Sequence, residues 1–254
     1  MRVIGMLLGI PEGDQEMVRD HFMESMRSGR TEDDAYGEFP DGEMFADYID
    51  WRREHPSDDL MTTLLNAEFE DETGETRCLT RSEILIFVTV LAGAGNETTN
   101  LLIGWMGKIL GEHPDERRAV AGDRSLVRNA VEELMRYESI AHIIGRTTSR
   151  DVELHGETIP AGSIVLALPA AANRDERAFT DPDRFDVRRS MGHHLAFGYG
   201  AHFCLGAALA RTEARVVLDE VLDRFPDWEV DLEHAAMLPP GPNRGWMSMP
   251  VAVG

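Results

Sequence analysis

Apolar residues recur at helical spacing along most of the chain, and the breaks in that spacing delimit the predicted elements. In the first third, the pattern predicts a helix over residues 13–26, an acidic loop over 28–42, a helix over 43–54, a short helix ending at Leu65, and a turn or small hairpin over 68–77. Ser57-Asp58-Asp59 is typical of a cap for the short helix.

The longest helix is predicted from Arg81 to Gly111, ending before His113-Pro114. Thr80-Arg81-Ser82-Glu83 has the form of a capping box, in which the Thr hydroxyl and the Glu carboxylate bond the exposed amides of a helix start. At ~1.5 Å per residue this helix is roughly 45 Å long. Residues 84–95 are apolar on every face, which predicts burial on all sides. The polar residues 96–100 in its middle argue against a membrane span.

That polar cluster has two interpretations. The Thr98 hydroxyl lies one turn after Ala94 and is expected to bond the Ala94 carbonyl, while Gly93 and Gly95 weaken the helix and permit a local opening. An opened turn beside Glu97 would leave a groove for dioxygen or water and a path for protons. An ordinary helix kink with a solvent-facing Glu-Thr pair explains the same residues.

The second half of the chain mixes helices with short strands. The predicted elements are a short helix from Pro114, a helix over 125–138, a meander or hairpin within 146–168, an irregular segment over 173–191, a helix over 207–225, and strand-like pieces at 228–230 and 246–253. Glu133 and Arg136 are three residues apart on one helix face, a spacing that is also common among surface ion pairs.

Cys204 carries the candidate chemistry, because it lies between glycines directly before a helix. The positive field of a helix N-terminus favours a thiolate, which can act as a nucleophile, a zinc ligand or the axial ligand of a haem iron. The only other cysteine, Cys78, is too distant in sequence for a zinc motif, and His202 is a weak hint of an activating base. Gly200 permits a tight turn with positive φ, and Gly206 leaves room for a flat macrocycle. A buried structural cysteine remains the alternative.

Composition narrows the class of protein. The chain has 254 residues, 43% of them hydrophobic, which suits one compact body. A formal net charge of −21 disfavours nucleic acids and anionic membrane surfaces as partners. Lys108 is the only lysine, and two isolated cysteines suit a reducing cytoplasm rather than a disulfide framework. The short apolar run that precedes Pro11 is too short to span a bilayer and is interpreted as part of a core helix.

Four motifs, taken in order, resemble those of the cytochrome P450 family, specifically its soluble bacterial haem-thiolate monooxygenases. They are Ala94-Gly95-Asn96-Glu97-Thr98-Thr99, Glu133-x-x-Arg136, Pro182-x-Arg184-Phe185, and Phe197-x-x-Gly200-x-His202-x-Cys204-x-Gly206. The resemblance implies a mainly α fold with a smaller β region, as one domain over residues 1–254 that corresponds to the C-terminal portion of the family architecture. Family members begin with a further segment, so we expect exposed apolar surface along the long helix and a tendency to associate.

The resemblance also implies a role for each motif residue. Cys204 is expected to be the axial iron ligand of heme b (iron protoporphyrin IX), held in a loop that contains Phe197, Gly200 and Gly206. Glu97 and Thr98 resemble the acid and alcohol that deliver protons, and Arg146 and His202 match positions that meet the haem propionates. Glu133, Arg136 and Arg184 resemble a buried ion network. The expected lining of the distal pocket is Phe87, Leu91, Ala94 and Ile143, although Phe87 and Leu91 also fit an ordinary core.

The expected activity is insertion of one atom of dioxygen into a small apolar organic substrate. Electrons are expected from NAD(P)H through a reductase and a ferredoxin or similar donor. Such donors are usually acidic, so Arg188, Arg189, Arg211 and Arg215 are candidate docking residues. Two alternatives stay open: a peroxygenase or isomerase that uses the same haem-thiolate, and a haem-free inactive fragment that serves as a structural or binding module.

Overall fold

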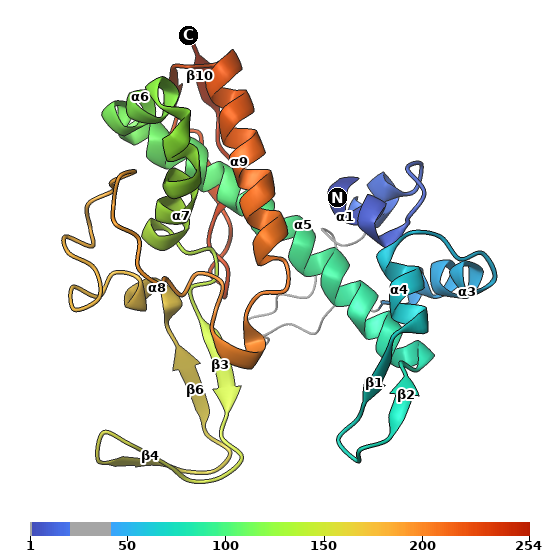
Figure 1. The fold of residues 1–254 in the computed structure, drawn as a ribbon. Helices are drawn as coiled ribbons and strands as arrows, with labels where there is room; N and C mark the ends of the chain where they lie inside the picture. Colours follow the sequence, from blue (N-terminus) through green and yellow to red (C-terminus); the bar gives the residue numbers. More distant parts are fainter. Residues whose placement is uncertain (1, 21–41) are drawn as a thin grey trace. The chain divides into compact units, whose positions relative to one another are not determined.

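The computed structural model describes residues 2–20 and 42–254, which belong to two compact units, Met1–Glu97 and Thr98–Gly254 (Figure 1). The boundary between the units falls inside the long helix α5 (Arg81–Glu112). A single domain over the whole chain stays a prediction.

The first unit is mainly helical. Its elements are α1 (Arg2–Leu8), η1 (Gly42–Phe45), α3 (Ala46–Glu54), α4 (Leu60–Asn66), the antiparallel pair β1 (Glu68–Glu70) and β2 (Thr76–Cys78), and the first half of α5. These confirm the predicted helix over 43–54, the short helix and the hairpin. Of the helix predicted over 13–26, residues 15–20 are helical and the remainder from 21 onward lies outside the described residues, as does nearly all of the predicted loop over 28–42.

Side-chain caps fix two helix starts in this unit, as the sequence predicts. The Asp59 carboxylate accepts the Thr62 amide at 2.7 Å at the start of α4. At the start of α5, the Glu83 amide donates to the Thr80 hydroxyl at 3.2 Å and the Thr80 amide donates to the Glu83 carboxylate at 2.7 Å, which completes the capping box. Hydrogen bonds from Arg77 are the main reason that the pKa of Glu83 falls to about 2.

Among the residues that the structure describes, those around the first half of α5 cover one face of it. Ile84, Val88 and Ala92 are buried, and Ile4 of α1 lies so close to Gly95 that any side chain there would collide with it. On the other side Ile86 is 63% exposed, and Phe87 and Val90 are exposed as well. The prediction of burial on every side is therefore wrong, whereas the expected apolar surface along this helix is confirmed.

The helix runs without interruption through the polar cluster, so no break marks the predicted local opening. By length and composition alone α5 is a weak candidate for a membrane span, and 33% of its most apolar window is buried. Core helices of soluble proteins have the same character, and the polar cluster interrupts the apolar run as predicted.

The second unit combines helices with four small antiparallel pairs of strands. Its helices are the second half of α5, α6 (Pro114–Gly122), η2 (Arg124–Leu126), α7 (Val127–Tyr137), α8 (Pro169–Ala172), η3 (Gly200–His202) and α9 (Ala207–Arg224). The strands are β3 (Ile144–Thr147) paired with β6 (Ile164–Ala167), β4 (Val152–Leu154) with β5 (Glu157–Ile159), β7 (Trp228–Val230) with β10 (Val251–Val253), and β8 (Ala236–Met237) with β9 (Trp246–Ser248). All predicted elements of this half are present, and α8, η3 and β8 are additions.

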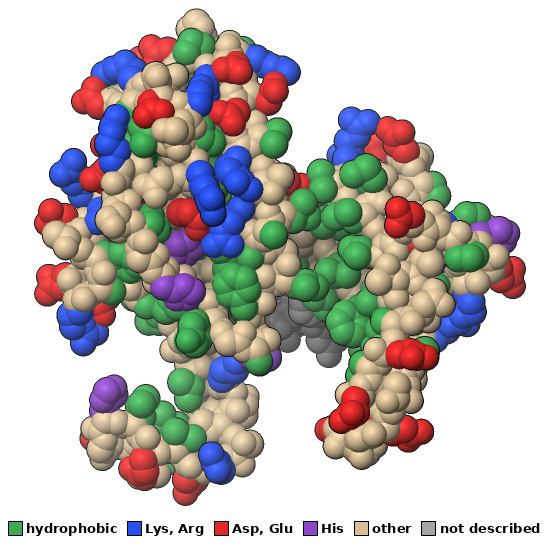
Figure 2. All heavy atoms as spheres, viewed as in Figure 1, with side chains coloured by type: hydrophobic (Ala, Val, Ile, Leu, Met, Phe, Trp, Pro, Cys, Tyr) green, Lys and Arg blue, Asp and Glu red, His purple; other side chains and the backbone are tan. Residues whose placement is uncertain are grey.

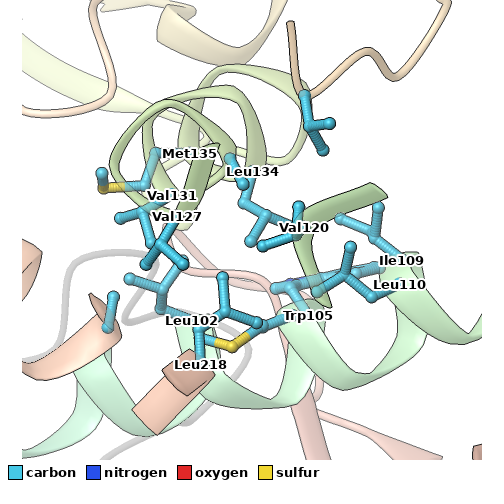
Figure 3. Close-up of a cluster of buried hydrophobic side chains, with 14 of the residues drawn as sticks. Leu102, Trp105, Ile109, Leu110, Val120, Val127, Val131, Leu134, Met135 and Leu218 are labelled. Carbon is cyan, nitrogen blue, oxygen red and sulfur yellow. The ribbon is translucent and has the colours of Figure 1, made fainter. Parts of the chain in front are cut away.

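The core of this unit lies where the second half of α5, α6, α7 and α9 meet (Figure 3). Leu102, Trp105 and Ile109 of α5 face Val131 and Leu134 of α7 across the cluster. α7 packs directly against α9, which follows the loop that contains Cys204, residues 197–206 (the cysteine loop). At the outer end of α5, the amine of Lys108 forms an ion pair with Glu112, one turn further on. Phe197, the first residue of the cysteine loop, packs against this core.

Candidate functional site

The cysteine loop, residues 197–206, is a tight turn closed by its own backbone. The Cys204 amide donates to the Phe197 carbonyl at 2.8 Å, and the Phe203 amide donates to the Gly200 carbonyl at 3.0 Å. Gly198 and Gly200 have φ of 72° and 67°, a left-handed conformation that favours glycine. Positive φ at Gly200 was predicted from the sequence, and the same requirement at Gly198 was not.

The loop presents the Cys204 thiol on its surface beside apolar side chains. Cys204 is an unpaired, exposed cysteine, and its neighbours Phe203 and Leu205 are exposed, Leu205 by 80%. A Cβ on Gly206 would lie 3.9 Å from the Cys204 sulfur, so glycine leaves that side of the sulfur open. An accessible sulfur within an open apolar surface fits a flat, largely apolar macrocycle whose metal takes one thiolate ligand.

A site with several protein ligands has no support in the described part of the chain. Residues 2–20 and 42–254 bring no group of three His, Cys, Asp or Glu side chains together in a way that suits a metal ion. Cys78, the second cysteine, is exposed on β2 in the first unit. The zinc interpretation of Cys204 therefore lacks a ligand set among these residues.

A buried ion network lies on α7. Glu133 and Arg136 are 0% exposed, and the Arg136 Nε and Nη2 donate to the two Glu133 oxygens at 2.7 and 2.9 Å. The second cation is Arg189, whose Nε donates to Glu133 Oε1 at 3.0 Å and whose side chain is 9% exposed. The Asp186 amide donates to the same oxygen at 3.1 Å.

Arg184 enters this network differently from the prediction. Its side chain is 66% exposed, and its guanidinium lies 3.8 Å from the Asp186 carboxylate. Only its backbone carbonyl takes part, since it accepts Arg189 Nη2 at 2.6 Å and Arg136 Nη2 at 3.4 Å. The guanidinium that balances Glu133 is thus five residues further along the chain than the motif suggests.

A second network, which the sequence did not reveal, surrounds Glu132. Arg211 of α9 donates through Nε and Nη2 at 2.7 and 3.0 Å, and His194 Nε2 lies 2.9 Å from Glu132 Oε2. Burial, the largest single influence, would raise the pKa of Glu132, yet the bonds from His194 and Arg211 lower it to about 2. The Arg211 guanidinium also lies over the ring of Phe197, 4.4 Å from its centroid.

Asn173 connects the Glu133 network to the segment that leads into the cysteine loop. Its side-chain amide donates to the Ser139 hydroxyl at 2.8 Å, and its Oδ1 accepts the Leu195 amide at 2.7 Å. Its backbone carbonyl accepts Arg136 Nη1 at 2.8 Å. The residue is buried, so these bonds define one conformation of the segment before Phe197.

The expected proton-delivery pair lies in the middle of α5. Glu97 and Thr98 are both half-buried, and the next hydroxyl, that of Thr99, donates to Glu213 of α9 at 3.2 Å. Glu97 is the last residue of the first unit and Thr98 the first residue of the second. Proton delivery by these two residues stays a prediction.

The expected propionate partners and pocket residues are accessible to different degrees. Arg146 and His202 are exposed, and Arg146 Nη1 donates to the Gly145 carbonyl at 2.7 Å. Of the four expected pocket residues, Phe87 and Ala94 are exposed. Leu91 and Ile143 are half-buried. Their common role stays a prediction.

Comparison with known proteins agrees with the motifs. The family model for cytochrome P450 matches residues 20–248. Among curated relatives, putative cytochrome P450 123 of Mycobacterium tuberculosis is 35% identical, with 100% of this chain and 63% of the relative covered. Cyclomarin C epoxidase CymV of Salinispora arenicola is 37% identical, with 90% of this chain and 58% of the relative covered. The chain thus spans less than two thirds of the length of these relatives.

Solved structures show the same relationship in three dimensions. A mutant of P450 EryK in complex with erythromycin B matches with a TM-score of 0.89 at 35% identity, covering 100% of this chain and 66% of the other. Ligand-free cytochrome P450 TbtJ1 matches with a TM-score of 0.86 at 37% identity, covering 99% and 67%. The predicted fold is therefore confirmed. From the matched residues, the ordered motifs and the geometry of the cysteine loop, it follows that the chain belongs to the cytochrome P450 family.

Proposed function

We propose that this chain is the haem-thiolate part of a monooxygenase that inserts one atom of dioxygen into an apolar organic substrate. The observation that carries the proposal is the conformation of the cysteine loop. Gly198 and Gly200 have left-handed backbone conformations, the Cys204 amide donates a hydrogen bond to the Phe197 carbonyl, and the Cys204 side chain is exposed. Membership of the family supports the same chemistry. Among the relatives, one is named an epoxidase and one was solved with erythromycin B, which supports a bulky natural product as the substrate class.

Each site residue has a defined task in this proposal. Heme b, when bound, supplies the activation of dioxygen, and a thiolate ligand favours cleavage of the O–O bond by donating electron density. Cys204 provides that thiolate. Arg146 and His202 bind the propionates, because both are exposed and can donate hydrogen bonds to carboxylates. Glu97 and Thr98 hold and move protons on the substrate side.

Electrons reach the site from a separate protein, which we propose to be a ferredoxin or a similar small donor reduced by an NAD(P)H-dependent reductase in the cytoplasm. Cationic side chains gather on the face formed by α7 and α9 (Figure 2). Arg189 is bonded to the buried carboxylate of Glu133 and Arg211 to the half-buried carboxylate of Glu132, so both serve the fold first. Arg188, which is exposed, and Arg215 remain as docking residues for an acidic donor.

The decisive experiment compares the two cysteines. The full chain is reconstituted with haem, reduced, and exposed to carbon monoxide, because the optical spectrum of that complex distinguishes thiolate-ligated iron from other ligation. We expect the thiolate spectrum for the unmodified chain and for Cys78→Ser, and its loss for Cys204→Ser. Cys78 is a matched control, since both cysteines are unpaired and exposed. A thiolate spectrum that survives Cys204→Ser, or that never forms, refutes the assignment.

A further inference from the structure

Side chains from three separate parts of the chain meet at the Glu132 carboxylate, and two of them also contact Phe197, the first residue of the cysteine loop. Glu132 lies on α7, Arg211 lies on α9 two turns after Cys204, and His194 lies in the segment just before the loop. The Arg211 fork holds the carboxylate at 2.7 and 3.0 Å while its plane covers the Phe197 ring. The His194 ring also lies beside Phe197, with 6.1 Å between the ring centroids.

The donors and acceptors in this group are matched. His194 Nδ1 accepts the Ala196 amide at 3.2 Å, so Nε2 carries the hydrogen that is donated to Glu132. The imidazole is then neutral, and one carboxylate faces one guanidinium. His194 is 6% exposed, and a balanced set of charges at such a buried position favours one fixed geometry.

The group is connected to the sulfur by one further bond. The carbonyl of Phe197 accepts the Cys204 amide at 2.8 Å, so the backbone position of Phe197 determines where the Cys204 backbone lies. The Ala207 amide donates to the Cys204 carbonyl at 3.2 Å, which ties the other side of Cys204 to the start of α9. Both ties therefore depend on how Phe197 and α9 are held together.

We propose that Glu132, His194 and Arg211 form a positioning triad that sets the direction of the Cys204 sulfur by fixing Phe197 against α9. As far as this concerns iron ligation, the inference rests on the proposed function. The triad acts through the loop backbone, so its members are positioning residues with no contact to substrate. It is distinct from the Glu133 network, whose direct bonds go to the segment around residues 184–189 and which reaches Leu195 only through Asn173.

The first test needs no haem. Amide hydrogen exchange of Cys204 is measured in the full chain, because that amide exchanges only when its bond to Phe197 opens. We expect Glu132→Gln and Arg211→Gln each to accelerate exchange at Cys204 at least tenfold more than exchange at Leu134 in the core of α7, which reports opening of the whole unit. Combining the two substitutions should add little to either alone, since both remove the same interaction.

The matched control is Arg124→Gln. Arg124 also joins the α7 side of the unit to α9, through Asp219 and Asp223, but at the end remote from the cysteine loop. We expect exchange at Cys204 to change less than twofold in this variant. If one triad variant fails to fold, the other decides. Equal exchange at Cys204 in the folded triad variants and the unmodified chain overturns the proposal, as does equal acceleration by Arg124→Gln.

The second test uses the haem-loaded chain and separates this inference from the proposed function. We expect Glu132→Gln and Arg211→Gln to reduce the fraction of protein with the thiolate spectrum under carbon monoxide, and Arg124→Gln to leave it unchanged. Arg211→Lys should rescue only in part, because an ammonium lacks the planar fork that spans Glu132 and Phe197. A thiolate spectrum lost with Cys204→Ser but unaffected by both triad variants keeps the proposed function and overturns the triad.

Discussion

Replacing Glu133 by Gln should destabilise the second unit more than any change at Arg184. The Glu133 carboxylate is fully buried and accepts four hydrogen bonds, two from Arg136, one from Arg189 and one from the Asp186 amide. Gln keeps the shape of the side chain but removes its charge, which leaves two buried guanidinium groups without a counter-ion. Removing one partner of a buried ion pair costs about 3–5 kcal/mol.

The same geometry gives a much smaller cost at position 184. The Arg184 side chain is mostly exposed and its nearest carboxylate is at 3.8 Å, so Arg184→Ala should cost about 0–1 kcal/mol. The contribution of this residue to the network is its carbonyl, which alanine retains. Arg189→Ala should fall between the two at about 1.5–3 kcal/mol, since it removes a charged hydrogen bond to a carboxylate that Arg136 still balances.

Urea unfolding followed by circular dichroism provides the measurement. With an m-value of about 2 kcal/mol/M, Glu133→Gln should lower the midpoint by about 1.5–2.5 M and Arg184→Ala by less than about 0.5 M. Arg184→Ala serves as the matched control, because it deletes a guanidinium of the same size a few residues from Arg189. A loss for Arg184→Ala as large as that for Arg189→Ala would refute the assignment of Arg189 as the second cation.

Three further predictions concern pH, backbone conformation and capping. Because the pKa of Glu132 is lowered from 4.5 to about 2, the stability that its ionised form contributes should be present above pH 4.5 and disappear as the pH falls toward 2, so unfolding curves of the unmodified chain and Glu132→Gln should converge in acid. Gly200→Ala should lower the free energy of unfolding by about 1 kcal/mol, because φ is 67° and no neighbouring atom would touch the added methyl group. Gly192→Ala, where φ is not in this region, should lower it by less than about 0.5 kcal/mol, and equal losses in denaturant unfolding would contradict the argument. Thr80→Ala should remove about 1 kcal/mol from the start of α5, measured by hydrogen exchange of its first turn, and unchanged exchange there would argue against the capping box.

Sequence reasoning succeeded where the physical signal is local. The capping box at Thr80, the Asp59 cap and Pro114 at the first turn of α6 each satisfy or replace amide groups within a few residues, so the helix starts follow from the sequence. The positive φ of Gly200 follows in the same way from the need for a tight turn. The family motifs indicate Cys204 as the thiolate ligand, a role that stays a prediction, and the structure shows that this cysteine is exposed.

It failed where partners are distant in the chain. Nothing near Glu132 in sequence indicates that Arg211, 79 residues later, completes its bonding, and the adjacent Glu133 drew attention as the motif residue. The pairing of Glu133 with Arg189 instead of Arg184 depends on the path of the irregular segment between them, which propensity does not specify. The all-apolar start of α5 predicted complete burial. Hydrophobicity indicates that burial of a surface is favourable, but it does not show that other residues bury it, and the described residues cover one side of this helix.

The ion pair of Lys108 with Glu112 has a practical consequence for the whole cationic surface. Lys108 is the only lysine, so every other strongly basic side chain is a guanidinium, which stays protonated far into the alkaline range. Raising the pH to about 11 would neutralise the amines of a lysine-rich docking face but should leave the arginine side chains of this protein charged. Amine-directed cross-linkers would find a single side-chain target, at the outer end of α5, so a search for the proposed electron donor calls for carboxylate- or guanidinium-directed reagents.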